Sequence, residues 1–293
     1  MLRSVWLNEL TWEDVAEYLE SRDLAILPIG STEQHGPAAP LGVDTYAAIA
    51  VAGDAARQAG VVVAPPLWFG DSPHHLGFPG TISLRSGTLA AVVKDVVHFL
   101  ARNGFRRFIF LNGHKGTNLA PLTVAGRDLL EYEPPDIQIA LADPLFLCTN
   151  ASEIKETGEH HACELETSHV WHKYPHLIKP DKLPCEAVDL ERLFPSAIRP
   201  DLFGRPGKMT AEVLWSSRER KCFAPAGSFS DASRSSPEKS RKYHENMVAN
   251  LVDFIAWFSW RERPDAPATG WGMKRLECDV LVIGLKTVPA SPS

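Results

Sequence analysis

Short apolar runs alternate with helical patterns in the first half of the chain, and this alternation limits the fold more than any other feature. The apolar runs are short and are bounded by Gly, Pro or polar residues, as buried strands are. They are residues 24–29, 61–64, 105–111 and 137–142. Helical patterns occupy residues 9–20, 44–60, 88–103 and a stretch that ends near residue 132. Strands that alternate with helices at this spacing build a parallel sheet covered on both faces, so we predict an α/β fold.

The second half of the chain is less regular. Residues 175–237 are rich in Pro, and we expect them to wall a pocket or to form a subunit contact. Residues 237–260 have the periodicity of a long amphipathic helix, whose aromatic end we interpret as core or interface. The composition changes beyond this helix, and residues 278–285 form a possible extra strand. We therefore expect one domain over residues 1–263 and a C-terminal extension over residues 264–293.

The composition excludes several classes of protein. The chain has 293 residues, a formal charge of −6, 44% hydrophobic and 23% charged residues, which is ordinary for a globular protein. Scattered basic residues leave no electrostatic footprint for nucleic acid. No apolar run approaches the roughly 18 residues of a membrane span, and Asn8 and Glu9 come too early for a signal peptide. The five cysteines form no Cys-x-x-Cys pair, which favours a reduced, cytoplasmic protein.

The loop after the first predicted strand holds three side chains with metal-ligand chemistry, namely Glu33, His35 and Asp44. In an extended chain, residues i and i+2 point the same way, so Glu33 and His35 can face one point. Glu-x-His is a weak signal by itself. The loop is equally compatible with a surface Glu, a loop His and an Asp44 that caps the next helix.

Another histidine, His114, lies in the loop after the third predicted strand. In open parallel sheets, sites form beyond the C-terminal ends of the strands, so the topology predicts that His114 lies near Glu33, His35 and Asp44. The alternative is a histidine in a turn, because Asn-Gly, which precedes it, is a common turn pair. The shared sheet edge favours a ligand.

A further cluster, residues 159–166, packs two histidines and three glutamates into eight residues at the start of a helical pattern. On a helix, His160 and Glu164 are i,i+4 neighbours, so the spacing favours Glu164 as the partner of a histidine. Glu166 then points elsewhere, unless the first turn is irregular. Carboxylates also favour helix N-termini, so a charged helix start is the alternative.

Four blocks of sequence together resemble the creatininase (creatinine amidohydrolase) family. They are residues 28–37 with Asp44, residues 75–84, residues 112–118 and residues 161–168. The likeness covers about residues 5–260. It implies a three-layer α/β/α sandwich around a mostly parallel sheet, two divalent metal ions (zinc, with manganese possible at one site) and a homo-oligomer, often a hexamer.

The resemblance also implies roles for individual residues. The implied metal ligands are two pairs and a bridge: Glu33 with His114, His35 with Glu166, and Asp44 between them. His161 would be the catalytic histidine and not a ligand. The family pattern thus overrules the helix spacing that favoured Glu164 as a ligand. The implied substrate side comprises Ser72, His75, Lys115 and Glu164.

The chain departs from the family pattern at positions that bear on the substrate. Creatininase has a glutamate at the metal site where this chain has Gly116, and the Trp and Asp that clasp creatinine have no match near residues 154–158. Ala38 stands where many members have His, and Cys163 where they have Gly. The family has other branches with glycine at the position of Gly116. These branches resemble formamide-cleaving enzymes, a peptide-trimming enzyme and a hydrolase of diketo-inositol rings.

We therefore predict a hydrolase with a dinuclear metal site that acts on a cyclic amide or a related C–N bond of a small molecule, with His161 moving protons. One alternative is the opening of a diketo-inositol ring of the 3-dehydro-scyllo-inosose type, which Lys115 and the polar loop 70–75 motivate. Another is the removal of a formyl group. An alternative of a different class is a metal-stabilised maturation or scaffold protein, against which the complete ligand set argues.

Overall fold

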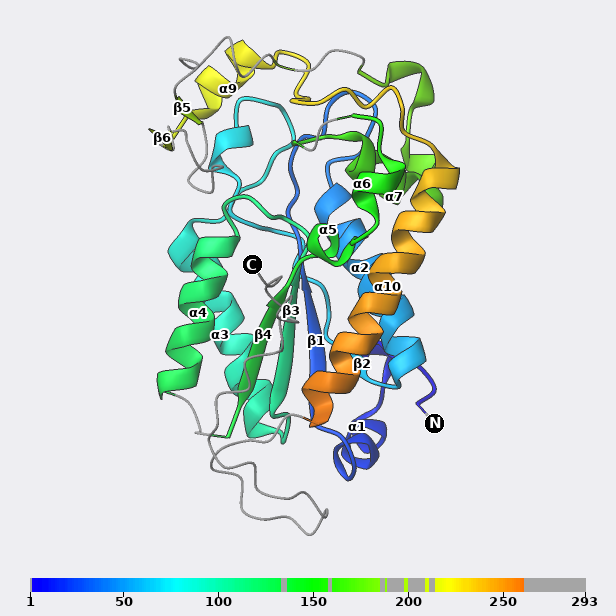
Figure 1. Cartoon of the computed structure of the whole chain (residues 1–293). Coiled ribbons are helices and arrows are strands. Elements are labelled where there is room, and N and C mark those ends of the chain that lie inside the picture. Colours follow the sequence, from blue (N-terminus) through cyan, green and yellow to red (C-terminus); the bar gives the residue numbers. More distant parts are fainter. Residues whose placement is uncertain are drawn as a thin grey trace, which may run out of the picture.

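A computed structural model gives the fold of the chain (Figure 1). It describes residues 2–132, 136–157, 160–184, 188, 198–199, 209–210 and 214–260. The possible strand at residues 278–285 and the expected domain boundary after residue 263 lie outside the described residues. Within the described part, none of the helices combines the length and the apolar character needed to cross a membrane.

A sheet of four parallel strands forms the centre of the described structure. The strands are β1 (Leu24–Ile29), β2 (Val62–Val63), β3 (Arg107–Asn112) and β4 (Gln138–Ala142), in the spatial order β2-β1-β3-β4. All four predicted strands are confirmed. β1 is buried at every position because a parallel strand covered on both faces must be apolar on both. Ile29 lies opposite Asn112, so β1 and β3 end at the same edge of the sheet.

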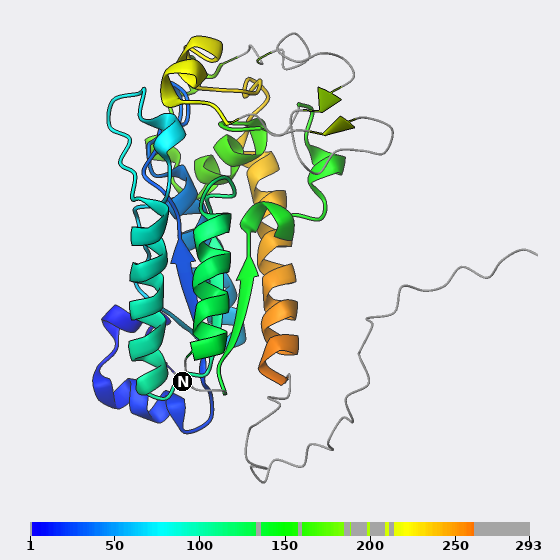
Figure 2. The same cartoon turned by 90° about the vertical axis from the view of Figure 1, so that its left-hand side faces the viewer.

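Helices cover both faces of the sheet, which gives the expected three-layer α/β/α sandwich (Figures 1 and 2). One face carries α2 (Val43–Ala59) and α10 (Pro237–Trp260), and the other carries α3 (Ser86–Arg102) and α4 (Leu119–Tyr132). Alternate residues of each strand serve different cores. Ile26 and Ile109 pack toward α2 and α10, whereas Leu27 and Phe108 pack toward α3 and α4.

A capping residue explains where the first helix begins, but Asp44 does not cap α2. α1 (Trp12–Leu19) begins at Thr11, which forms a capping box with Asp14: each side chain accepts a hydrogen bond from the main-chain N–H of the other residue. The alternative in which Asp44 caps the next helix is wrong. Gly42 is the residue that precedes α2, so Asp44 lies within the first turn and its carboxylate is not used as a cap.

Two further predictions change in the second half of the chain. α7 (Glu164–Lys173) begins after the two histidines, so the helical spacing assumed for His160 and Glu164 is wrong. The stretch 175–237 contains a helix that the sequence did not predict, α9 (Ser217–Phe223). The remaining elements are short: η1 (Leu7–Glu9), η2 (Pro73–His75), α5 (Pro144–Leu147), α6 (Ala151–Ile154), η3 (Pro175–Leu177), η4 (Pro180–Lys182), β5 (Ile198–Arg199) and β6 (Met209–Thr210).

One end of the sandwich gathers the loops that carry the predicted site residues. The loops after β1 and β3 leave the sheet at its C-terminal edge, at the top of Figure 1, where α7 and α9 also lie. Parallel sheets form their sites at this edge.

Candidate metal centre

The centre begins with Glu33, in the loop after β1, and His114, in the loop after β3. Glu33 is fully buried, and its Oε1 lies 3.4 Å from His114 Nδ1, which confirms the predicted proximity of the two loops. The same oxygen lies 3.5 Å from His75 Nε2 and 3.6 Å from His161 Nδ1. One carboxylate oxygen therefore faces three imidazole rings.

Asp44 lies between two histidines. Its Oδ1 is 3.1 Å from His35 Nε2, and its Oδ2 is 3.1 Å from His114 Nδ1. A Cβ at Gly113 would lie 2.0 Å from the main-chain oxygen of Asp44, so only glycine lets the loop after β3 approach the first turn of α2. The glycine next to His114 is thus part of the reason that the two side chains meet.

Main-chain carbonyls set the orientation of the histidine rings. Three histidines each turn one ring nitrogen to a carbonyl oxygen: His35 Nδ1 to Glu33 at 3.2 Å, His114 Nε2 to Asp71 at 3.2 Å, and His161 Nε2 to Gln34 at 2.7 Å. A neutral ring that donates through one nitrogen has a lone pair on the other. In all three rings the other nitrogen faces a buried carboxylate of the centre, and metal-ligating histidines are held in this way.

An irregular turn directs His161 at the centre. Ala162 has a φ of 56°, the one positive φ at a non-glycine among the described residues, so the chain turns sharply before α7 begins. Glu166 follows in the first turn of that helix, and its Oε2 accepts a hydrogen bond from the Cys163 N–H at 3.4 Å. Its charge contributes to the raised pKa of His35, which puts Glu166 on the His35 side of the centre.

Glu164, predicted on the substrate side, is buried and uses both carboxylate oxygens in contacts within the chain. Its Oε2 accepts hydrogen bonds from the main-chain N–H groups of Glu156 and Thr157, both at 3.0 Å, and its Oε1 lies 2.7 Å from Lys239 Nζ. Both oxygens thus hold the 156–157 segment and the start of α10 together. The predicted substrate contact would need an oxygen that these bonds already use.

Gln34 holds two of the rings in place. Its Nε2 lies 2.8 Å from His75 Nδ1 and 2.9 Å from the carbonyl oxygen of Gly227. It also lies 2.8 Å from His161 Nε2, but that nitrogen already donates to the Gln34 carbonyl, so the two amide hydrogens go to His75 and Gly227. Gly227 has a φ of 84°, and a Cβ there would lie 2.0 Å from Gln34 Oε1, so a side chain would break the arrangement.

The other predicted substrate residues lie at different depths. Ser72 is buried, with its Oγ 2.5 Å from Ser31 Oγ and 3.4 Å from His114 Nε2, so it lies beside the centre. Lys115 is exposed, and its Nζ lies 4.2 Å from the centre of the Phe146 ring, which puts it at the rim.

The carboxylates and histidines of the ion-free centre perturb one another strongly. Burial disfavours the charged rings of His35 and His114, but the carboxylates outweigh it and raise the pKa of His35 to about 10 and of His114 to about 9. Burial opposes the ionisation of Asp44, but these two rings lower the pKa of Asp44 to about 2. In the absence of ions, the protonated rings of His35 and His114 therefore supply positive charge that bound cations would otherwise supply.

Burial is the main cause of the shifted pKa values of three neighbouring groups, Glu166, His161 and His75. Burial raises the pKa of Glu166 to about 7, with His35 opposing the rise. Burial, with the charge of His35, holds the pKa of His161 well below its usual range. Burial and His74 likewise lower the pKa of His75. His161 is therefore a neutral ring at neutral pH, with its Nδ1 lone pair directed at the centre.

Three residues near the centre were not predicted as site residues. They are His74, Asp143 and Arg220. His74 Nδ1 is buried without a hydrogen-bond partner, and burial raises the pKa of Asp143, at the start of α5, to about 6. The His74–His75 pair and the position of Asp143 after a predicted strand were usable signals. Arg220 had none, because its helix was not predicted.

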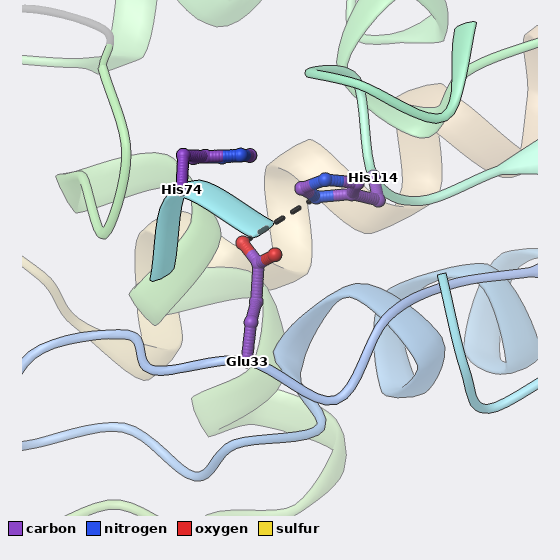
Figure 3. Close-up of side chains that lie close together, drawn as sticks. All are labelled: Glu33, His74 and His114. Atoms are coloured by element: carbon purple, nitrogen blue, oxygen red, sulfur yellow. Dashed lines mark ion pairs between the residues drawn. The ribbon is translucent and has the colours of Figure 1, made fainter. Parts of the chain in front are cut away.

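The donor atoms of the centre suit divalent cations. Among the described residues, both Glu33 oxygens, His35 Nε2 and Asp44 Oδ2 are buried without a hydrogen-bond partner. Two groups of ligand atoms lie within 4.8 Å of one another: Glu33 with His35 and His161, and Glu33 with His74 and His114. Figure 3 shows the Glu33 carboxylate pointing into the space between His74 and His114. Imidazole and carboxylate together suit zinc or manganese.

The spacing of the donors also fits a shared ion. Two atoms that each lie about 2.0–2.2 Å from a tetrahedral zinc ion are about 3.3–3.6 Å apart. The pair made by Glu33 with His114 is 3.4 Å apart and lies in this range, and the two pairs made by Asp44 are slightly closer, at 3.1 Å.

Comparison with known proteins identifies the family. A model of the creatininase family, described as creatinine amidohydrolase, matches residues 8–255. The chain belongs to the creatininase family. A crystal structure of creatinine amidohydrolase (creatininase) matches with a TM-score of 0.72 at 25% identity, over 89% of this chain and 100% of that one. Creatininase structures described as the Zn–Zn type and as the Mn form match with TM-scores of 0.72 and 0.70, each at 26% identity over 88% of this chain and 100% of theirs.

Two curated relatives differ in what they cleave. A 3-dehydro-scyllo-inosose hydrolase from Thermotoga maritima is 37% identical over 121 residues, which are 41% of this chain and 39% of that protein. A mycofactocin precursor peptide peptidase from Mycolicibacterium smegmatis is 35% identical over 182 residues, which are 59% of this chain and 67% of that protein. Membership of the family therefore gives a hydrolase and leaves the bond open.

Proposed function

We propose that this creatininase-family hydrolase cleaves an amide-type C–N bond of a small molecule, with two divalent ions held by its own side chains. The observation that supports this most is the position of Asp44, with one oxygen 3.1 Å from His35 and the other 3.1 Å from His114. A carboxylate in that position can join two ion sites. The proposed ligands are two sets joined by Asp44: Glu33, His74 and His114 on one side, and His35 and Glu166 on the other.

The ions that we propose are zinc, with manganese possible at one site. When bound there, two such ions would supply an acidified water molecule and a polarised carbonyl group. The protein's part is to hold the ligands rigid, which the carbonyl contacts of the histidine rings and the amide of Gln34 do.

His161 is the proposed acid–base residue. Its Nε2 is fixed by the Gln34 carbonyl oxygen at 2.7 Å, and its Nδ1 faces the centre. Because burial keeps the pKa of His161 low, Nδ1 is free at neutral pH to take a proton from the attacking water. The same nitrogen then returns the proton to the departing nitrogen of the amide, which needs one to leave.

The two curated relatives support other bonds for the same residues. A peptide bond and a C–C bond next to a ketone also need an activated water, a polarised carbonyl and a proton donor. Peptide trimming and the opening of a diketo-inositol ring are therefore the second candidates, along with removal of a formyl group. A scaffold without turnover would not need the free Nδ1 of His161, so we place that alternative last.

The test is hydrolysis by protein that has been stripped with a chelator and then given zinc or manganese. The panel contains lactams, formamides, short peptides and an inosose-type diketone. We expect metal-dependent turnover of an amide, lost in Glu33→Gln and kept in the surface control Glu245→Gln. Turnover that survives chelation and Glu33→Gln would exclude the metal mechanism. Full metal occupancy without turnover of any substrate would favour the scaffold.

We also propose a cytoplasmic homo-oligomer, a hexamer by the family resemblance, with residues 1–263 as one domain. The five cysteines form no Cys-x-x-Cys pair, which supports a reducing compartment. Trp257 and Trp260 at the end of α10 are 46% and 70% exposed and offer apolar surface for a subunit contact. Light scattering of the purified protein tests the number of chains.

A further inference from the structure

Arg220 is a half-buried cation beside the candidate centre, and it has no ion-pair partner in the part of the chain that the structure describes. Its Nε is buried and makes no hydrogen bond, and its guanidinium forms no ion pair with any described residue. Arg106 and Arg107 provide the contrast, because each pairs with an aspartate at 2.5 Å. Withdrawing a charge from water without a partner is costly. A guanidinium in this state has N–H donors available to a ligand.

Two contacts hold Arg220 beside the centre. Its Cζ lies 4.7 Å from the centre of the Phe229 ring, and the Phe229 N–H donates to the carbonyl oxygen of His161 at 3.1 Å. The helix α9 also packs on η2, the turn that carries two histidines of the centre. That packing is close, because a Cβ at Gly77 would lie 2.8 Å from the main-chain oxygen of Ser217 at the start of α9.

These contacts bring Arg220 close to the histidines of the centre. Phe229 links it to His161, and the packing of α9 on η2 links it to His74 and His75. Arg220 therefore lies near the space between these side chains.

The charge balance of the centre favours an anion in that space. The carboxylates of Glu33, Asp44 and Glu166, with that of Asp143 nearby, carry four negative charges, which balance two divalent ions, so Arg220 leaves one positive charge. A ligand that enters the buried centre therefore meets a net positive field, which is screened less there than at the surface.

We propose that Arg220 binds a carboxylate of the substrate, so that the protein acts on small amides that carry a carboxylate in preference to their neutral counterparts. This rests on the proposed hydrolase function and narrows its substrate class. A guanidinium can donate two parallel N–H···O bonds to a carboxylate. Stacking on Phe229 limits the rotation of the guanidinium plane, so less freedom is lost when the bonds form.

The experiment uses matched pairs that differ only at the carboxylate. Each pair is an amide substrate with a free carboxylate and the same molecule with a carboxamide there: a lactam acid, an N-formyl amino acid and a short peptide with a free C-terminus. We expect the metal-loaded protein to prefer the carboxylate member by at least about 30-fold in kcat/KM, mostly through KM. In Arg220→Met the preference falls to within about threefold, and in Arg220→Lys it is intermediate. Arg218→Met, an exposed arginine on the same helix, keeps it.

A second measurement does not need turnover. Isothermal titration with N-acetylglycine and with N-acetylglycinamide compares the binding of the acid and the amide. We expect the acid to bind the full-length protein at least tenfold more tightly, and the difference to disappear in Arg220→Met at an unchanged metal content. Equal binding of the two ligands, or a preference that survives Arg220→Met, overturns the role of Arg220. Absence of turnover with a retained binding preference overturns the proposed hydrolase function and not the carboxylate site.

Discussion

The described structure has two buried histidine clusters, and they use their ring nitrogens in different ways. In the second cluster, between α2, α7 and α10, His169 Nε2 lies 3.0 Å from His244 Nδ1, and His244 Nε2 lies 2.7 Å from Asp54 Oδ2. Lys173 Nζ lies 2.6 Å from the same aspartate oxygen. Each of these contacts is a hydrogen bond in a chain that leads from the interior to the surface.

At the candidate metal centre, the nitrogens converge instead of following one another. His35 Nε2 and His114 Nδ1 face opposite oxygens of Asp44, and several of these buried atoms have no hydrogen-bond partner. The comparison teaches that the presence of buried histidines does not mark a metal site. The direction of the lone pairs does, and main-chain carbonyls set that direction.

We expect the largest difference between the clusters when the aspartate of each is replaced by asparagine, its isosteric amide. Asp44→Asn removes the charge between the two proposed ion sites and leaves one oxygen acceptor, so we expect metal affinity to fall by at least about 100-fold. The kcat/KM of the metal-loaded protein should fall with it. Asp54→Asn is the matched change in the second cluster and should leave the metal content unchanged. Elemental analysis after dialysis measures both, and an equal metal content in the two variants would contradict a bridging Asp44.

The next largest effect that we expect is the release of protons when the candidate metal centre binds its ions. In the ion-free protein, the pKa values of His35 and His114 are raised to about 10 and about 9, so both rings are charged at pH 7.5. Each must lose a proton to bind an ion, so zinc binding should release about two protons per chain at pH 7.5. The number should fall as the pH rises through 9 to 10, because the rings then lose their protons beforehand. Titration calorimetry in buffers of different ionisation enthalpy measures it, and binding without release would exclude these two ligands.

Asp54→Asn should affect stability and not metal. Burial alone would raise the pKa of Asp54, but hydrogen bonds from Lys173 and His244 hold it below its usual range. A carboxyl with a lowered pKa stabilises the fold above its unfolded pKa of about 3.9 and loses that contribution as the pH falls. We expect the free energy of unfolding to drop by about 1–2 kcal/mol at pH 7. Urea denaturation at pH 7 and at pH 3.5 tests this, and a difference that grows at pH 3.5 would contradict it.

We expect the smallest effect on kcat/KM from a substitution of Lys115, at the rim of the candidate centre. Lys115 is exposed and lies over the Phe146 ring, a contact worth about 0.5–1 kcal/mol. Lys115→Met should therefore change kcat/KM by less than about fivefold. A loss of more than about 100-fold, with an unchanged metal content, would support the substrate contact predicted from the sequence.

The sequence predicted the parts of the molecule that depend on periodicity and on topology. The bounds of β1 and of α10 agree with the predicted ranges, because long apolar patterns determine them. The meeting of Glu33 and His114 follows from the rule that parallel strands end at one edge. These predictions needed no knowledge of side-chain positions.

The rest depends on backbone details that composition does not encode. The left-handed φ of Ala162 turns His161 toward the centre, and a non-glycine residue gives no signal of that conformation. The helical spacing favoured Glu164 as the partner of a histidine, but α7 begins at Glu164 and does not include His160. Arg220 lies on α9, a short polar helix in a Pro-rich stretch, so neither its position nor its lack of an ion-pair partner among the described residues was predictable.

Anomalous X-ray diffraction from a crystal of the protein grown with zinc tests the central claim most directly. The account predicts two anomalous peaks about 3.5–4 Å apart, one beside each oxygen of Asp44, with His114 at one and His35 at the other. A single peak away from Asp44, or a peak between Asp54 and His244, would contradict it.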